Sequence, residues 1–471
     1  MAPCGSIDGG RFLRDAAGSQ AMKEKGPTTL AICLMVLIFV FLLDITFKIS
    51  ISSVTYSKRT EDKTISEQNL SKQRSKVTEP IKCDRSHYEY DVCYLNRSTV
   101  LDPTTATLSA VDPTNSTPRQ LEKIRPYPRK WQNQVMSLIR ELTLTTAPPN
   151  TSCAIIHRIP ALVFSAGGYT GNFLHDFNDG FIPLFLTVNS LLPNQEIILV
   201  EIILVVVNCN EGWLLKYAKL LHRFTSHPII NLDDETITHC FPSATVGLIS
   251  HGPMTVNPTL LPGPHSKSIL DFRALLATTY SQSHELPSKQ LKARPQLVMV
   301  SRESNRRILN QDDVQEAAED VGFDVVIFEP THKTPLHEAF RLIDASHAMM
   351  GVHGAGLTHE LFLRPGAVFM QVVPIGFDWL AEICFGKLAI SLGLEYIEYD
   401  IEAQESSLMD KYARDSLELS NPGAILNGNW SKMGTYLTQD VKLDLVRTRK
   451  YLEKAYKKAR KFMLRESLYV E

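Results

Sequence analysis

The hydrophobic positions fall into two patterns, one long uncharged run near the N-terminus and many short runs beyond residue 150. Residues 28–43 carry no charge, and apolar residues resume after Asp44. The stretch 28–47 is therefore long enough to span a bilayer, which takes about 20 residues. Lys23 and Lys25 precede it, which predicts a cytosolic tail at 1–27. A cleaved signal peptide is the alternative, but no small-x-small cleavage site follows, so we expect a retained anchor.

The segment after the anchor has few large apolar residues. Residues 48–82 are rich in Ser, Thr, Lys, Glu and Gln, a composition that predicts a flexible stem. Residues 100–130 carry many Pro and Thr residues and are expected to form an irregular lead-in. Residues 135–142 are expected to form a short helix or strand at the domain entry.

Strand and helix patterns alternate from about residue 153. Apolar runs predict strands at 161–166 and 197–207, with helices at 174–190 and 212–224. Such alternation indicates a parallel sheet with helices on its faces. A polar, proline-bounded linker is expected at 285–295.

The second half alternates more regularly. Further strands are expected at 296–301, 324–329, 347–353, 367–373 and 395–401. Helices are expected at 310–322, 335–346 and 379–393, followed by a long basic helix at 438–465. Asn310 is the expected N-cap and Gly322 the stop of the first of these helices. We therefore predict two α/β domains, 83–290 and 291–471, the second of them Rossmann-like.

Net charge and cysteine content indicate which classes of function and which cellular compartment are possible. The net charge of −2 over 471 residues argues against a nucleic-acid partner. Six cysteines follow the anchor; we expect Cys83 and Cys93 to form a disulfide and Cys384 to be a buried thiol. Acceptor triplets for N-glycosylation agree with a lumenal location; they begin at Asn69, Asn96, Asn115, Asn150 and Asn429.

The stretch "GVHGAGLTHELFL", residues 351–363, predicts a strand end, a glycine turn and a helix start. Such a helix start attracts anions, and Gly354 and Gly356 allow close approach of the backbone to a diphosphate. His353 is placed to donate to a phosphate or sugar hydroxyl. The third glycine of the dinucleotide fingerprint is replaced by His359, and the P-loop Lys-Ser/Thr pair is absent. A tight turn without a ligand is the alternative.

A cluster of arginines follows another strand of the same domain. The stretch "VSRESNRRILN", residues 300–310, contains Arg302, Arg306 and Arg307. Guanidinium groups match phosphate oxygens, so this cluster and the glycine turn predict a diphosphate site at one sheet edge. Solvated loop arginines are the alternative.

A third group of polar residues lies in the first domain. The stretch "GNFLHDFNDGFIPLF" contains Asn172, His175, Asp176 and Asp179. His175 and Asp179 are four residues apart and share a helix face, an arrangement suited to removing a proton from a hydroxyl. Asp176 is more simply a helix cap. The spacing fits no recognised metal site, and the chain has no Asp-x-Asp motif. Further along the chain, other residues that could line a cleft are His239 and His251.

These motifs, in this order behind an anchor, resemble plant glycosyltransferase family 61. The resemblance implies a GT-B-like fold of two Rossmann-like domains facing a cleft, and an inverting, metal-independent reaction without a cofactor. It implies that Arg302, Arg306 and the turn His353, Gly354, Ala355 and Gly356 bind the donor diphosphate. It also makes Asp179, assisted by His175, the expected base, although either residue could take the proton.

The resemblance further implies a type II Golgi membrane protein that transfers a pentose, arabinofuranose or xylose, from a UDP-sugar to xylan. Its expected partners are the UDP-pentose, a glycan acceptor, the membrane and Golgi synthase complexes. A β-1,2-xylosyltransferase of N-glycan cores and a non-catalytic glycan-binding protein are the alternatives. A hydrolase is disfavoured because the Gly-x-Ser-x-Gly elbow is absent, and an NAD enzyme because the glycine fingerprint is incomplete.

Overall fold

A computed structural model of the protein describes residues 79–112, 119–148, 151–192, 201–263, 266–281, 293–426 and 432–468. The expected tail and anchor lie outside these ranges, as do nearly all of the stem and the triplets at Asn69, Asn115, Asn150 and Asn429. Within the described ranges, no helix has the length and apolar character that a membrane span requires. The remaining triplet begins at Asn96, which is exposed.

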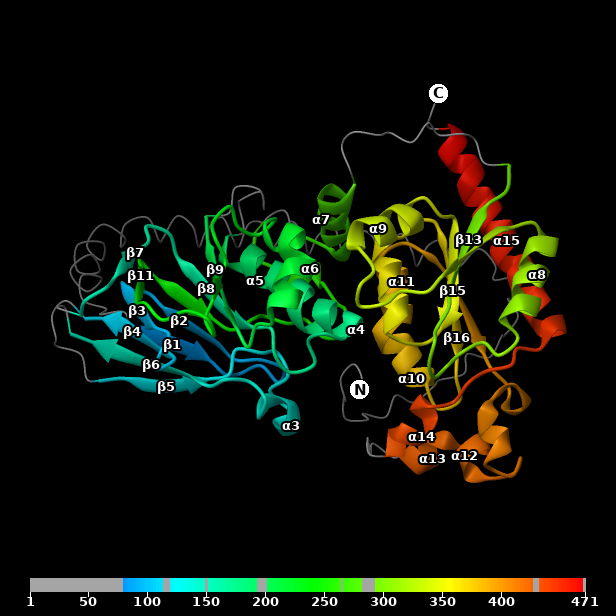
Figure 1. The fold of residues 1–471 in the computed structure, drawn as a ribbon, viewed down its shortest axis with the longest axis horizontal. Coiled ribbons are helices and arrows are strands. Elements are labelled where there is room, and N and C mark those ends of the chain that lie inside the picture. The colour runs from blue at the N-terminus through cyan, green and yellow to red at the C-terminus, as the bar shows by residue number, and fades with distance from the viewer. Residues whose placement is uncertain are drawn as a thin grey trace, which may run out of the picture. The chain divides into compact units, whose positions relative to one another are not determined.

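The first half of the described chain contains two six-stranded sheets (Figure 1). In sheet order, the first contains β1 (Ile81–Asp84), β2 (Val92–Leu95), β12 (Ala244–Val246), β8 (Ala161–Ser165), β9 (Ile203–Val207) and β10 (Ile230–Asn231). The second contains β5 (Leu121–Ile124), β6 (Leu142–Ala147), β4 (Thr107–Val111), β3 (Thr99–Asp102), β11 (His239–Phe241) and β7 (Ile155–Ile156). The expectation of an irregular lead-in at 100–130 is therefore wrong, since β3, β4 and β5 all begin in or next to that stretch.

Both faces of the first sheet are buried. Alternate residues of β8 and β9, such as Val163 and Val205, pack toward the second sheet. Their neighbours Leu162 and Leu204 pack on the other face with helices α5 (Ile182–Leu191), α6 (Glu211–Leu221) and α7 (Ile269–Tyr280). Burial on both faces explains the uninterrupted apolar runs that predicted these strands.

The helical run expected at 174–190 is present but interrupted. It consists of α4 (Phe173–His175), a π-helical turn η2 (Asp176–Phe181) and α5. A π turn widens the helix and is common at functional sites. Here it contains Asp179, one of the expected catalytic residues.

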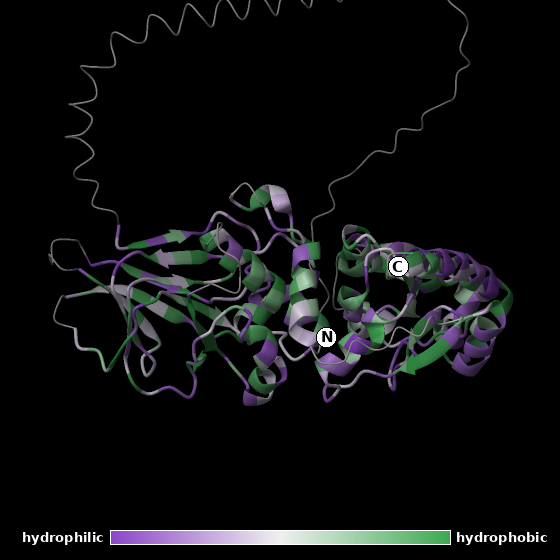
Figure 2. Ribbon diagram, turned by 90° about the horizontal axis from the view of Figure 1, so that it is seen from above, coloured by the Kyte–Doolittle hydropathy of each residue, from purple (hydrophilic) through white to green (hydrophobic). Residues whose placement is uncertain are grey.

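The second half has a five-stranded parallel sheet, and all five expected strands are confirmed. Its order is β14 (Asp324–Phe328), β13 (Gln296–Val300), β15 (Ala348–Val352), β16 (Val368–Val373) and β17 (Glu395–Asp400). Helices α8 (Gln311–Val321) and α15 (Leu445–Leu468) pack on one face. The other face is covered by α9 (Leu336–Asp344), α10 (Asp378–Ala381), the π turn η6 (Glu382–Gly386) and α11 (Lys387–Ser391). Figure 2 shows hydrophilic residues along the helices at the outer edge of this half.

One local prediction in this half is wrong and another holds only in part. The terminal helix begins at Leu445 rather than 438, because Val441 forms β-bridges with Ile308 and Ser406. Asn310 occupies the N-cap position of α8 as expected, but its side chain bonds to the backbone N–H and carbonyl of Leu443 instead of capping the helix. Gly322 ends the helix as expected.

Short helices complete the described elements. They are α3 (Asn133–Met136), η4 (Pro258–Leu260), η5 (Ala355–Phe362), η7 (Ala403–Glu405), η8 (Ser407–Asp410), α12 (Leu417–Ser420), α13 (Pro422–Leu426) and α14 (Met433–Leu437).

Two disulfide bonds cross-link strands in the first half. Cys83 and Cys93 face each other across β1 and β2, which confirms the expected pair. A second bond, Cys153–Cys240, joins the start of β7 to β11 and was not predicted. Cys384 is a buried free thiol, as expected.

Candidate functional site

The five-stranded sheet changes direction between β13 and β15. Numbered along the chain within this half, the strand order is 2-1-3-4-5, so the connections leave β13 and β15 toward opposite sides. Ligands of open α/β sheets bind beyond the carboxyl ends of strands at such a point. Arg302 and Arg306 follow β13, and His353 and Gly354 follow β15.

Arg302 lies directly against the glycine turn. A Cβ atom at Gly354 would lie 2.5 Å from Nη1 of Arg302 and 3.5 Å from Nη2 of Arg306. A side chain at position 354 would therefore displace the Arg302 guanidinium from its present position. The loop holds Arg302 in place through a hydrogen bond from its Nε to the carbonyl of Asn305, 3.0 Å away. The predicted proximity of the arginine cluster and the glycine turn is confirmed.

Arg306 is a buried cation that pairs with no carboxylate among the described residues. Its exposed fraction is 5%, and its Nε has no hydrogen-bond partner among the described residues. Burial, together with the charge of Arg302, lowers the pKa of Arg306 to about 10. In the described ranges neither arginine forms an ion pair, whereas the exposed Arg307 pairs with Asp440. Two adjacent unneutralised guanidinium groups make a site for an anion.

His353 is neutral, and its neighbours select its tautomer. Burial, followed by the charges of Arg306 and Arg302, lowers the pKa of His353 well below its ordinary value. Nε2 of Gln371 lies 2.8 Å from Nδ1 of His353, and the Tyr396 hydroxyl lies 2.9 Å from Oε1 of Gln371 and 2.6 Å from Glu398. With the Gln371 amide in this orientation, it donates to Nδ1, and the His353 proton lies on Nε2 beside the arginines.

The turn continues into η5, a 3₁₀ helix whose first residues are Ala355 and Gly356. A short helix was expected near Gly356 and is present. The first amides of a helix have no acceptor within it, so they add donors for an anion. The structure thus brings together all six residues expected at the diphosphate site.

A second polar group lies where the first sheet changes direction, between β8 and β12. His175 and Asp179 follow β8, while Ser250 and Gly252 follow β12. Together with the side chains of Arg129 and Trp131, Asp179 and the β12 loop line a small pocket. This group therefore occupies the same topological position in its sheet as the arginine cluster does in the other.

Asp179 is fully buried and saturated with donors. Its oxygens accept from Nε of Arg129 at 2.9 Å, from the hydroxyl of Tyr127 at 2.7 Å and from the Asn178 amide. Nδ1 of His175 is also 2.9 Å from Oδ2. Burial raises the pKa of Asp179, but the charge of the adjacent Arg129, together with the hydrogen bonds from His175 and Arg129, outweighs burial and lowers it. Asp179 is therefore ionised at neutral pH and is a weak base.

The ionised Asp179 fixes the direction of its hydrogen bond with His175. Nδ1 of His175 lies 2.9 Å from Asp179 and 3.2 Å from Nη2 of Arg129; because the carboxylate can only accept, we infer that Nδ1 donates to Asp179, which leaves the imidazole lone pair on Nε2. A buried carboxylate that fixes a histidine in this way also stabilises the imidazolium formed when a proton is taken up. Tyr169 packs on the ring, 4.6 Å between centroids, and limits its rotation.

Asn172 and Asp176 have structural roles. Asn172 caps α4 by accepting a hydrogen bond from the backbone N–H of Leu174. Asp176 accepts from Trp213, from the Tyr217 hydroxyl and from the N–H of Gly171, so it joins α6 to the π turn rather than capping a helix.

The two histidines expected to line a cleft lie apart. His251 follows β12, and its Nδ1 accepts from the backbone N–H of Asn257. His239 belongs to β11 of the other sheet and lines a different pocket with His157 and Glu235. The structure therefore does not bring His239 together with Asp179.

The two polar groups are linked by a direct contact between α4 and η5. The ring of Phe173 stacks on His359 with 4.2 Å between centroids. Phe173 is two residues from His175, and His359 belongs to the helix that begins at the glycine turn.

Several residues at these sites were not predicted, chiefly Tyr127, Arg129, Gln371 and Phe377. Arg129 and Tyr127 lie in "RPYPRKWQ", 50 or more residues from Asp179 in sequence. The only sequence feature that could have pointed to these two residues is a basic side chain next to prolines and aromatic residues. The ring of Phe377 lies 5.8 Å from the Arg306 guanidinium and also packs on His353.

In the part of the chain that the structure describes, no group of His, Cys, Asp or Glu is arranged to hold a metal ion.

An α/β protein with an anion site at one switch point and a carboxylate–histidine pair at another has the parts of a group-transfer enzyme. The sequence profile of Glycosyltransferase 61 matches residues 170–370, which include both groups. A xylan glycosyltransferase of Arabidopsis thaliana is 36% identical over 418 residues, covering 84% of this chain and 83% of that protein.

Two further relatives come from Oryza sativa subsp. japonica. An alpha-1,3-arabinosyltransferase is 32% identical and covers 86% of this chain and 70% of its own length. A beta-1,2-xylosyltransferase is 36% identical and covers 71% of each chain. The chain belongs to glycosyltransferase family 61, and it is an enzyme of the pentosyltransferase type.

Proposed function

We propose that this protein is an inverting Golgi glycosyltransferase that moves arabinofuranose or xylose from a UDP-sugar to xylan. The observation that carries the proposal is the pair of the partly buried Arg302 and the buried Arg306, which form no ion pair among the described residues and lie against Gly354 at the switch point of the second sheet. The names of the relatives support a pentose and a xylan acceptor. The second candidate is β-1,2 transfer of xylose to an N-glycan core, for which one relative's name supports the sugar and the linkage but not the acceptor.

In the proposed reaction the diphosphate of the donor binds to Arg302, Arg306, Nε2–H of His353 and the first amides of η5. The UDP leaving group gains negative charge as the glycosidic bond breaks, and donors already fixed in place stabilise that charge without reorganisation. The arrangement needs no metal or cofactor, because two guanidinium groups supply the positive charge.

The acceptor hydroxyl loses its proton to Nε2 of His175, and its oxygen bonds to the anomeric carbon from the side opposite UDP. Asp179 stays ionised and stabilises the resulting imidazolium. Arg129 holds Asp179 in position through its Nε and Nη2 atoms. The same proposal places the donor in the second of two GT-B-like domains and the acceptor against the first.

The proposal also includes a type II orientation in the Golgi membrane, with residues after 47 in the lumen. Two disulfides support an oxidising compartment. Microscopy of the tagged full-length protein with a Golgi marker, and protease protection of each terminus, tests this part.

The central experiment measures transfer by the full-length protein. Purified enzyme is incubated with UDP-arabinofuranose or UDP-xylose and xylohexaose, and the products are analysed by mass spectrometry. We expect one pentose to be added with wild-type protein and at least a hundredfold slower transfer with Arg302→Ala. Arg307→Ala is the matched control, because Arg307 is exposed and paired with Asp440. Equal loss in both variants, or full activity in Arg302→Ala, contradicts the proposed site.

A further inference from the structure

A pocket in the first half lies apart from the residues discussed so far. It has a volume of about 680 Å³, within the range of roughly 300–1,000 Å³ typical of small-ligand sites. Its lining includes Ile159, which precedes β8, and the first residues of β9 and β10, Ile203 and Ile230. These strands are parallel, so the pocket lies at their amino ends, whereas His175 and Asp179 follow the carboxyl end of β8.

The separation between the two places follows from the length of β8. Five residues at about 3.3 Å each extend roughly 16 Å. A ligand of one sugar unit cannot contact both ends, but an oligosaccharide that runs along the sheet can.

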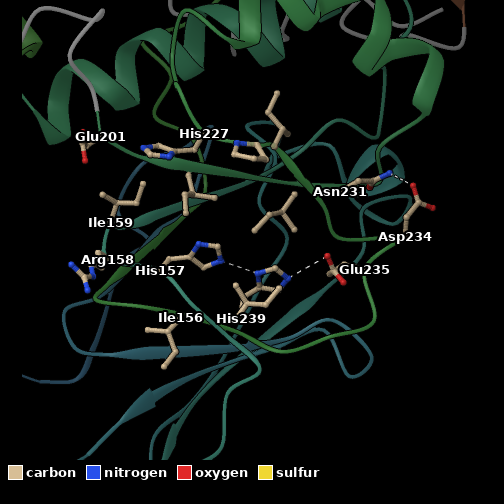
Figure 3. A pocket seen from close by; sticks show the side chains of 15 residues that line it. Ile156, His157, Arg158, Ile159, Glu201, His227, Asn231, Asp234, Glu235 and His239 are labelled. Atoms are coloured by element: carbon tan, nitrogen blue, oxygen red, sulfur yellow. Dashed lines mark hydrogen bonds and ion pairs between the residues drawn. The ribbon is translucent and has the colours of Figure 1, made fainter.

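A chain of polar side chains crosses one wall of the pocket (Figure 3). Nε2 of His157 is 2.9 Å from Nδ1 of His239, and Nε2 of His239 is 3.2 Å from a carboxylate oxygen of Glu235. Of the two facing nitrogens of His157 and His239 one donates and the other accepts, so of the two remaining ring nitrogens one carries a proton and the other a lone pair. The wall therefore presents both acceptors and donors, which suits hydroxyl groups, since each of them donates and accepts.

Two further properties indicate the chemistry of the ligand. The buried Nε2 of His227, on the opposite wall, has no hydrogen-bond partner among the described residues. Charged lining residues are mostly acidic, Glu201, Asp234 and Glu235 against Arg158, which disfavours an anion. Isoleucines supply an apolar surface for the C–H face of a sugar ring; the side chain of Ile156 is 77% exposed.

The Cys153–Cys240 disulfide fixes this wall. Cys240 directly follows His239, and β7, which contributes Ile155 and Ile156 to the pocket, begins two residues after Cys153. The covalent bond therefore holds β7 against β11 and keeps the pocket formed before a ligand arrives, which lowers the entropic cost of binding.

We propose that this pocket is a second carbohydrate-binding site, which holds a neutral stretch of the acceptor glycan away from the point of transfer. The identity of that glycan as xylan rests on the proposed function. The existence of a site that recognises hydroxyl groups does not rest on the proposed function, because that part of the inference is argued from the pocket alone.

The test measures glycan binding in the absence of any donor. Xylohexaose is titrated into the full-length protein by calorimetry, and the double variant His157→Ala/Glu235→Gln is compared with wild type. We expect the dissociation constant to increase about tenfold. The matched control is His222→Ala/Glu211→Gln, which makes the same two kinds of change at exposed residues. Glu211 belongs to α6 and His222 directly follows it, and this variant should bind xylohexaose as wild type does.

A second variant guards against loss of folding. Ile156→Asp adds a carboxylate at the exposed mouth of the pocket, and we expect unchanged thermal unfolding with at least fivefold weaker xylohexaose binding. Wild-type affinity in both pocket variants overturns the inference, as does binding of Zn²⁺ in place of the glycan.

Failure of this inference is distinguishable from failure of the proposed function. Arg302→Ala should abolish UDP binding and leave xylohexaose binding intact. If UDP does not bind the wild-type protein, the proposed function fails while the pocket is still tested by the glycan titration. If xylohexaose binding does not depend on the pocket, only the second site fails.

Discussion

The buried charge of Arg306 should make the ligand-free protein less stable than a variant with an uncharged side chain at this position. The fold lowers the pKa of this buried arginine from 12.5 to about 10. At about 1.4 kcal/mol per pKa unit, the environment disfavours its charge by roughly 3 kcal/mol. Methionine has a similar length and no charge, and replacing buried charges with apolar side chains is often stabilising. We therefore expect Arg306→Met to raise the free energy of unfolding by about 1–3 kcal/mol.

The same substitution should remove the response to UDP. A ligand that binds only the folded state, present at 100 times its dissociation constant, adds about 2.7 kcal/mol. Urea unfolding with and without UDP should show this gain for wild type and little or none for Arg306→Met. Arg307→Met is the control: Arg307 is exposed and bonded to Asp440, so its variant should not gain stability and should still respond to UDP.

Two results would refute this reasoning. A well-folded Arg306→Met protein that is less stable than wild type without UDP would mean that the guanidinium has a compensating partner. An undiminished UDP response in that variant would mean that the anion binds elsewhere.

Three further predictions concern buried groups. The lowered pKa of Asp179 stabilises the fold above the unfolded-state pKa of about 4, and this stability is lost as pH falls further; wild type should therefore lose more stability than Asp179→Asn between pH 6 and 3 in urea unfolding. Glu360 has no hydrogen-bond partner among the described residues, and burial raises its pKa, so it stabilises the fold only at acidic pH; Glu360→Gln should gain stability over wild type at pH 7 and little at pH 4 in the same assay. Cys153→Ser should lower the unfolding free energy by about 2–4 kcal/mol, more than Cys83→Ser does, because the Cys153–Cys240 bond closes the longer loop; urea unfolding of both variants measures this, and equal losses would contradict it.

The second half was predictable from sequence because its strands are buried on both faces and its helices are amphipathic. Both produce long, regular patterns, and all five strands were located within one residue at each end. The start of α15 was wrong because Val441 pairs with Ile308, more than 130 residues earlier in the chain. A contact at that separation leaves no local trace in the hydrophobic pattern.

The first half was less predictable because its second sheet is made of short strands with small or polar residues. The β4 sequence "TLSAV" alternates between buried and partly buried positions, but Ser, Ala and Thr hide that alternation. The proximity of the arginines to the glycine turn was predictable from sequence because each set follows a strand directly. Arg129 was missed because it reaches Asp179 from 50 residues away.

The separation of the two polar groups onto different sheets has a consequence for divergence within the family. Loops after β8 and β12 surround His175 and Asp179, while loops after β13 and β15 carry the arginines and the glycine turn. A change in one set of loops leaves the backbone of the other sheet untouched. Under the proposed function, a change in the β12 loop would alter which hydroxyl is glycosylated and leave donor binding intact, and chimeras that exchange only that loop between relatives would give new linkages.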